Sequence, residues 1–306
     1  MSSDTLSSIA GLALLLLLAP LVPGVATRTR AWLTGRRGSP VWQSYADVWK
    51  LLRRGIVYSR TTTAAFRLTP IAALATVVAA ASLVPLDGRT SLLSFPGDIL
   101  AFAYVLALGR FVLVLGALDT GSSFEGMGAS REVTFAALVE FALFLALAAL
   151  GVVTRTASLS GMLGGPLASQ WSSAAPALTL IAAALFVLLL AECSRSPVDD
   201  PTTHLELTMI HEVMILDHSG PDLGVIVYAN AVKLSMLGAV VARVAWPVAR
   251  FGAAARLGAL AASILAVGVL VGVVEASTAR VRLQKVPIVV ASAAALSALG
   301  LVLLLG

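Results

Sequence analysis

Charged residues are scarce in this 306-residue chain, and their scarcity excludes an ordinary soluble domain. Only 12% of the residues are charged and 58% are hydrophobic, whereas a soluble domain carries about 25% charged and about 45–50% apolar residues. Long apolar runs recur along the chain, which favours membrane-spanning helices over the shorter alternating strands of a barrel. The composition therefore predicts an all-α, polytopic membrane protein.

Cysteine is almost absent as well. The single Cys193 excludes an internal disulfide and any multi-cysteine metal cluster. The three histidines, His204, His211 and His218, are seven residues apart and are expected near one face of a helix that ends at 219–220. A step of two turns is about 10.5 Å, which is too long for two histidines to share one ion. We expect no metal site and no catalytic residue.

Other absences narrow the class of membrane protein further. The chain has no internal repeat, which argues against inverted-repeat transporters. No basic segment precedes the first apolar stretch at 6–25, so we expect a retained span and not a signal peptide. The net charge of +5 comes from basic residues beside apolar spans, which is typical of topology signals and anionic lipid contacts, not of nucleic-acid binding.

The apolar runs predict about eight spans in a single membrane domain, residues 1–306. Their expected ranges are 6–26, 64–84, 98–118, 133–153, 175–193, 222–245, 256–276 and 286–305. Residues 39–55 follow the first span and alternate apolar and polar faces at helical spacing, with Trp42 and Trp49 among them. This segment predicts an amphipathic helix at the membrane interface.

Lysine and arginine are unequally shared between the two sides of the membrane. With the N-terminus outside, the inner side receives fifteen of them: Arg28, Arg30, Arg36, Arg37, Lys50, Arg53, Arg54, Arg60, Arg67, Arg110, Arg131, Arg195, Arg280, Arg282 and Lys285. The outer side receives five: Arg89, Arg155, Arg243, Arg250 and Arg256. The positive-inside rule therefore predicts that both termini face out and that residues 192–222 face the cytoplasm.

Ionisable residues inside the spans are candidates for function. Glu140 and Lys233 lie within predicted spans, and either charge facing lipid would cost a few kcal/mol, so both are expected to face the bundle interior. They are interpreted either as parts of a proton path or as a structural buried pair. Glu275, near a span end, is expected to reach the interface or to pair with Arg280.

The segment 192–222 is expected to be an acidic cytoplasmic loop. It contains all three histidines and seven carboxylates: Glu192, Asp199, Asp200, Glu206, Glu212, Asp217 and Asp222. Glu192 and Arg195 are three residues apart and are expected to pair if the preceding helix continues. Asp200-Pro201 and the run to Glu206 fit helix capping, which we weigh equally with a functional role.

These residues carry a family resemblance. The run ECSRSPVDDP at 192–201, with Glu206 and the Ser-Gly at 219–220, resembles the signature of the complex I membrane subunit beside the peripheral arm, called subunit 1 or H. The fuller run 197–220 is more similar to its relatives in group 4 NiFe hydrogenases, of the formate hydrogenlyase and hydrogenase-4 type. Residues 117–132 and 275–283 agree with this, so the resemblance covers essentially the whole chain.

The resemblance implies eight transmembrane helices with an amphipathic helix after the first. Complex I usually has acidic residues where Thr202 and His204 stand here, and this departure disfavours a quinone site and favours the hydrogenase branch. It implies no cofactor in this subunit, with nickel-iron and iron-sulfur centres in partner subunits. Those partners would be hydrogenase-like large and small subunits, an iron-sulfur protein and antiporter-like membrane subunits, in a bacterial inner membrane.

The predicted function is to dock a soluble redox module and couple its electron transfer to proton or cation translocation. The predicted coupling path comprises Glu140, Glu192, Arg195, Asp199, Asp200, Glu206, Glu212, Lys233 and Glu275. Residues expected to contact partners are Glu132, Asp217, Arg280 and Arg282. The alternatives are a genuine complex I subunit with a quinone chamber and a passive membrane anchor.

Overall fold

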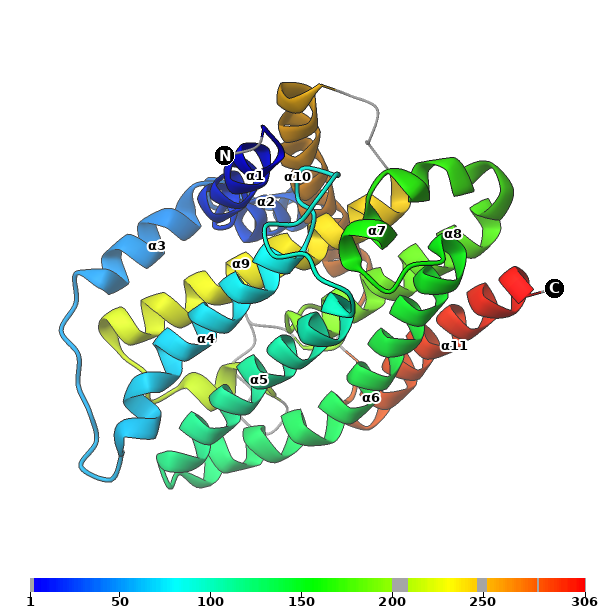
Figure 1. Cartoon of the computed structure of the whole chain (residues 1–306). Helices are drawn as coiled ribbons and strands as arrows, with labels where there is room; N and C mark the ends of the chain where they lie inside the picture. Colours follow the sequence, from blue (N-terminus) through cyan, green and yellow to red (C-terminus); the bar gives the residue numbers. More distant parts are fainter. Residues whose placement is uncertain (1–2, 200–208, 247–251, 280, 306) are drawn as a thin grey trace.

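The computed structural model describes residues 3–199, 209–246, 252–279 and 281–305, and every regular element in these ranges is a helix (Figure 1). The elements are α1 (Ser3–Leu18), α2 (Leu21–Leu33), α3 (Gln43–Leu52), α4 (Ala64–Leu83), α5 (Asp98–Asp119), α6 (Ser123–Thr154), α7 (Leu159–Leu163), α8 (Gly165–Glu192), the 3-10 helix η1 (Glu212–Ile215), α9 (Gly220–Ala245), α10 (Ala253–Ser277), the 3-10 helix η2 (Leu283–Lys285) and α11 (Val286–Leu305). Seven helices in the described ranges are long and apolar enough to cross a membrane, and the pair α1–α2 makes an eighth if it is counted as one bent span. The predicted polytopic all-α class is confirmed.

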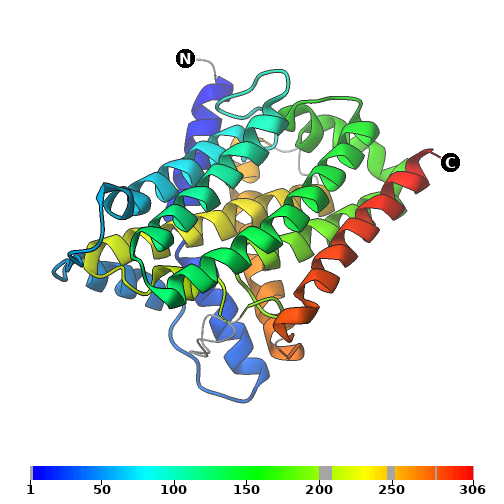
Figure 2. The same ribbon diagram turned by 90° about the horizontal axis from the view of Figure 1, so that it is seen from below.

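Helix α9 occupies the centre of the bundle. It crosses the middle in both views, while α11 lies at an edge (Figures 1 and 2). It packs against α3, α4, α8 and α10, and its span is the most buried of the candidates. Because a helix surrounded by other helices has little lipid-facing surface, α9 can carry polar residues such as Lys233 without exposing them to hydrocarbon.

The first span is broken, contrary to the continuous segment 6–26 that the sequence predicted. Helices α1 and α2 meet at an angle of 46°. Pro20 stands between them and has no amide hydrogen for the carbonyl of Leu16, four residues earlier. The hydroxyl of Tyr228 on α9 donates to this carbonyl at 2.9 Å instead. The break is thus stabilised by the central helix.

The predicted amphipathic helix at 39–55 is present as α3, which has no buried residue and lies against α9 and α2.

Helix α6 differs more from its prediction. It begins at Ser123, ten residues before the predicted 133, and is a single 32-residue helix. The early part is polar or small (SFEGMGASRE), so hydropathy alone did not detect it.

Three basic residues counted as loop residues lie buried inside helices. Arg110 is in the middle of α5, Arg243 is in the last turn of α9 and Arg256 is near the start of α10. Each therefore belongs to the interior and does not contribute to the charge difference between the two sides.

The segment 209–219 also differs from the prediction. It contains the short η1 and not a longer helix, so His211 and His218 do not share a helical face.

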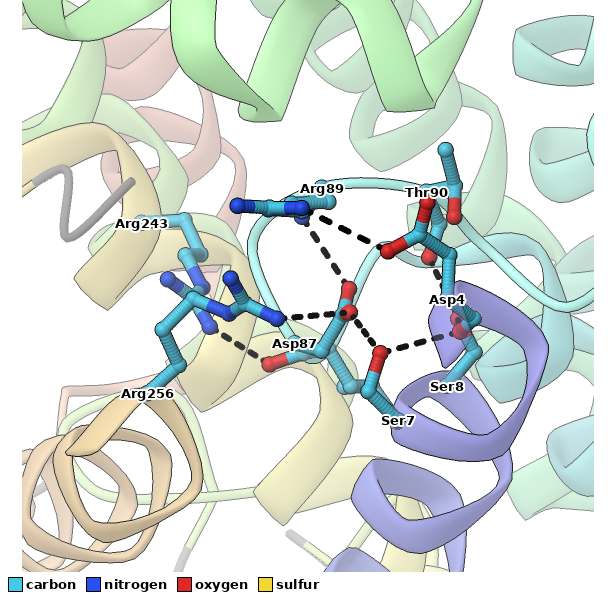
Figure 3. Close-up of polar contacts among 9 residues, drawn as sticks. Asp4, Ser7, Ser8, Asp87, Arg89, Thr90, Arg243 and Arg256 are labelled. Carbon is cyan, nitrogen blue, oxygen red and sulfur yellow. Dashed lines mark hydrogen bonds and ion pairs between the residues drawn. The ribbon is translucent and has the colours of Figure 1, made fainter. Parts of the chain in front are cut away.

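A polar cluster around Asp87 lies at the end of α9 that is remote from Gly220 (Figure 3). Asp87 is fully buried, accepts hydrogen bonds from Ser7 Oγ (2.6 Å) and the Arg89 amide (3.0 Å), and lies 3.7 Å from Arg256 Nη2. Arg243 donates to the carbonyl of the residue before Asp87. These contacts join α1, the loop after α4, α9 and α10, which indicates a structural role.

Candidate functional site: a buried chain of ion pairs

Glu192 is the centre of the candidate site. It is the last residue of α8, and its side chain is 3% exposed. One carboxylate oxygen accepts from Arg110 of α5, and the other lies 2.6 Å from Lys233 Nζ of α9. Lys233 also donates to the backbone carbonyl of Glu192 at 2.8 Å. The free carbonyls at a helix C-terminus attract cations, so the end of α8 suits this arrangement.

Arg110 extends the site to a second carboxylate. Its other terminal nitrogen donates to Glu140 of α6, whose side chain is 38% exposed while that of Arg110 is 6% exposed. Lys233 faces the bundle interior, as the sequence predicted, whereas the Glu140 side chain is partly exposed. The two residues pair with other partners and not with each other. Two cations and two carboxylates balance in charge, which makes their burial tolerable.

His211 and Glu132 form a second ion pair nearer the acidic segment. His211 Nδ1 lies 3.2 Å from Glu132 Oε2. Burial alone would lower the pKa of His211, but the Glu132 carboxylate outweighs it, and the net pKa is raised. Asp199 fixes the segment because its carboxylate accepts from the amides of Ile210 (3.2 Å) and His211 (3.3 Å).

A small cavity connects the two groups of ion pairs. Its volume is about 20 Å³, and Arg110, Glu132, Glu192 and Asp199 are among its lining residues. This volume is sufficient for about one water molecule, and the walls provide the polar partners that a buried water requires. Polar groups therefore continue from His211, through Glu132 and the cavity, to Glu192, Arg110 and Glu140.

A larger cavity of about 470 Å³ lies beside the same residues. Its wall combines apolar side chains of α4, α5 and α9 with Arg110, Lys233 and His211, and Asp47 of α3 also lines it. The volume lies in the range of about 300–1,000 Å³ found for small-molecule sites. Among the described residues, no group of three or more His, Cys, Asp or Glu side chains could hold a metal ion.

Arg195 does not pair with Glu192, and that prediction is wrong. Arg195 Nη1 lies 3.4 Å from Glu275 Oε1 of α10. The helix α8 ends at Glu192, and Ser194 adopts a positive φ of 50°, so the chain turns before Arg195 and the helical i,i+3 spacing no longer applies. The pair closes the bundle between α8 and α10.

The other predicted residues lie in different surroundings. Glu132 was expected at a partner surface, but it is buried. Glu212 begins η1 and lines the large cavity, whereas Asp217 and Arg282 are exposed. Asp200, His204, Glu206 and Arg280 lie outside the described residues. Sequence reasoning missed Arg110 and His211 as site residues; a charge in the middle of a predicted span was the signal for Arg110.

Comparisons with known proteins agree on one family. A family model described as NADH dehydrogenase matches residues 7–305. Hydrogenase-4 component C of Escherichia coli K12 is 33% identical over 220 residues, 72% of this chain and 68% of that protein. Formate hydrogenlyase subunit 4 of the same organism is 32% identical over 275 residues, 88% of each chain. A chain of the membrane-bound sulfane sulfur reductase, an archaeal respiratory membrane complex, has the same fold, with a TM-score of 0.83 at 19% identity over 99% of this chain and 100% of that one.

Proposed function

Because the chain belongs to the NADH dehydrogenase family, we propose that it is a membrane subunit of a hydrogenase-type redox complex. It docks a soluble electron-transfer module at the acidic segment and couples the redox reaction to translocation of protons or another cation. The two relatives from hydrogenase-4 and formate hydrogenlyase support this assignment. The observation that carries it is the buried chain of ion pairs from His211 to Glu140.

The mechanism is electrostatic. Electron transfer in the docked module changes the charge near residues 209–219, and the first groups to respond are His211 and Glu132, 3.2 Å apart. A proton delivered to the water-sized cavity reaches the group around Glu192, where charges are balanced. An added proton leaves an excess of positive charge there. Because buried like charges repel strongly, release through the half-exposed Glu140 is favoured.

The hydrogenase-4 and formate hydrogenlyase relatives support soluble redox partners for this chain. Nickel-iron and iron-sulfur centres belong to the soluble module, and none is bound in this subunit. An antiporter-like membrane subunit covers the side of α6 around Glu140, where Leu138 and Phe141 are also exposed. The complex lies in a bacterial inner membrane with the acidic segment on the cytoplasmic side, as the distribution of basic residues predicts.

The test compares redox turnover with translocation in the intact complex. Glu140→Gln and Lys233→Met should each leave electron transfer largely intact and reduce translocation at least about tenfold, because each breaks one ion pair of the chain. Asp4→Asn breaks the half-exposed ion pair with Arg89, away from the acidic segment and the buried chain of ion pairs, so it is the matched control and should change neither. Unchanged translocation in both Glu140→Gln and Lys233→Met would instead support the passive anchor.

A second candidate function is a quinone chamber, and the cavity of about 470 Å³ favours it. Its apolar walls suit an isoprenoid compound, and Arg110 and Lys233 could polarise a carbonyl oxygen. This candidate predicts that quinone co-purifies with the complex and that quinone-site inhibitors stop electron transfer. The hydrogenase-type assignment predicts redox turnover that persists after quinone is extracted.

A further inference from the structure

The walls of an open apolar groove come from α1, α3 and α9, whose positions Figure 1 shows. Its volume is about 510 Å³, within the range of ligand sites. Its walls come from the second half of α1, from Tyr45 to Leu52 of α3, and from Tyr228 of α9. Leu17 and Trp49 in these walls are 65% and 58% exposed, so the described residues leave this part of the groove largely uncovered.

The polar atoms in the floor of the groove already have partners. The Leu16 carbonyl, left without a donor by Pro20, accepts from Tyr228 at 2.9 Å. The neighbouring Leu17 carbonyl accepts from the Tyr45 hydroxyl. A ligand in the groove therefore gains little from hydrogen bonding there, and the groove suits a hydrocarbon chain.

One end of the groove is strongly basic. The guanidinium of Arg53 lies 4.5 Å above the ring of Trp49, which lines the groove. Lys50 and Arg54 are exposed beside it, and residues 48–86 contain no Asp or Glu. Arginine binds phosphate oxygens through its planar fork, and basic residues with tryptophan are typical of the headgroup region.

We propose that this groove is a binding site for an anionic phospholipid, with one acyl chain in the groove and the phosphate on Arg53 and its basic neighbours. The lipid would hold α3 against α1 and α9. An isoprenoid quinone tail is the competing occupant, because the groove shares Pro20 and Val48 with the large cavity. A quinone carries no phosphate, so dependence on Arg53 separates the two.

The test uses the complex purified in an uncharged detergent and titrated with phosphatidylglycerol brominated on its acyl chains. Quenching of tryptophan fluorescence reports binding, and the Trp49→Phe variant identifies the part that comes from Trp49. Phosphatidylglycerol should quench Trp49 and bind at least about fivefold more tightly than phosphatidylethanolamine with the same chains. Arg53→Gln should weaken the binding about fivefold, and Arg53→Lys should retain most of it.

Two further variants control for folding and for position. Arg36→Gln removes an exposed charge outside the groove and should leave binding unchanged. Ala13→Leu fills the groove and should weaken binding of both lipids. Equal affinity for the two lipids, no effect of Arg53→Gln, or unchanged binding to Ala13→Leu would each overturn the proposal. So would displacement of the brominated lipid by an equimolar uncharged quinone analogue.

Discussion

At the residue scale, the carboxylate of Glu192 contacts two buried cations at once, Arg110 and Lys233. Neutralising it with Glu192→Gln leaves Arg110 and Lys233 with one remaining carboxylate, Glu140. Breaking a buried ion pair on one side costs about 3–5 kcal/mol because the other charge stays uncompensated. We therefore expect the free energy of unfolding to fall by about that amount, measured by denaturation of the purified protein in detergent.

A second variant tests whether uncompensated positive charge causes the loss of stability in Glu192→Gln. The double variant Glu192→Gln with Lys233→Met removes one charge of each sign, so it should recover a large part of the lost stability. Asp217→Asn, at an exposed position, should change stability by less than about 0.5 kcal/mol. A double variant as unstable as Glu192→Gln would contradict the coupling between Glu192 and Lys233.

His211 and His218 are expected to make the stability of the fold depend on pH in opposite directions. The pKa of His211 is raised above 6.5, so its protonated form stabilises the fold at low pH, and this stabilisation is lost as the pH rises through the raised pKa. Burial lowers the pKa of His218 from 6.5 to about 4, so stability is lost as the pH falls through that interval. His211→Gln should flatten the alkaline side of a plot of Tm against pH. His218→Phe, which keeps the stacking on Phe66, should flatten the acid side.

At the element scale, the position of the acidic segment depends on a close approach to α6. A Cβ at Gly128 would collide with the Val213 side chain and lie 3.0 Å from the carbonyl of Ile210. Gly128→Ala should therefore push residues 210–214 away from α6, accelerate hydrogen exchange of their amides and cost about 1–3 kcal/mol. Gly126→Ala lies in the same helix in open space and should be neutral or slightly stabilising. Equal exchange in both variants would refute the close approach.

The elements differ in how much of them the sequence predicted. Spans such as α5 and α11 follow directly from hydropathy, because a run of about 20 apolar residues is sufficient evidence. The start of α6 at Ser123 was missed because its first turns are polar and extend beyond the apolar run. The bend after Leu18 was missed because Pro20 can be accommodated in a helix if another element supplies the lost donor, and Tyr228 is 208 residues away.

The sequence also predicted the candidate site only in part. The sequence identified Glu192, Glu140 and Lys233 because a charge in or beside an apolar run is unusual. It did not identify their partners, because pairing depends on which helices become neighbours. Arg110 was assigned to a loop, yet it joins α5 to both α6 and α8. Tertiary packing, not local spacing, selects each ion pair.

At the scale of the whole molecule, orientation in the membrane decides whether the acidic segment can meet a cytoplasmic redox module. The chain allows a direct test because Cys193 is 2% exposed and burial raises its pKa to about 12, so it should not react with a maleimide. Two introduced cysteines can then report on the two ends of α6. Asp217 lies at one end, where its amide donates to Glu125 at 2.9 Å, and Arg155 follows the other end.

We expect a membrane-impermeant maleimide to label Asp217→Cys in inverted vesicles and Arg155→Cys in spheroplasts. The physical reason is the excess of Lys and Arg on the side of the acidic segment, which keeps those loops in the cytoplasm. The unmodified chain, with Cys193 as its single cysteine, is the control and should remain unlabelled in both preparations. Labelling of both variants from one side would contradict a membrane-spanning α6. Labelling of Asp217→Cys in spheroplasts alone would place the acidic segment outside, where a cytoplasmic hydrogenase-type module could not reach it.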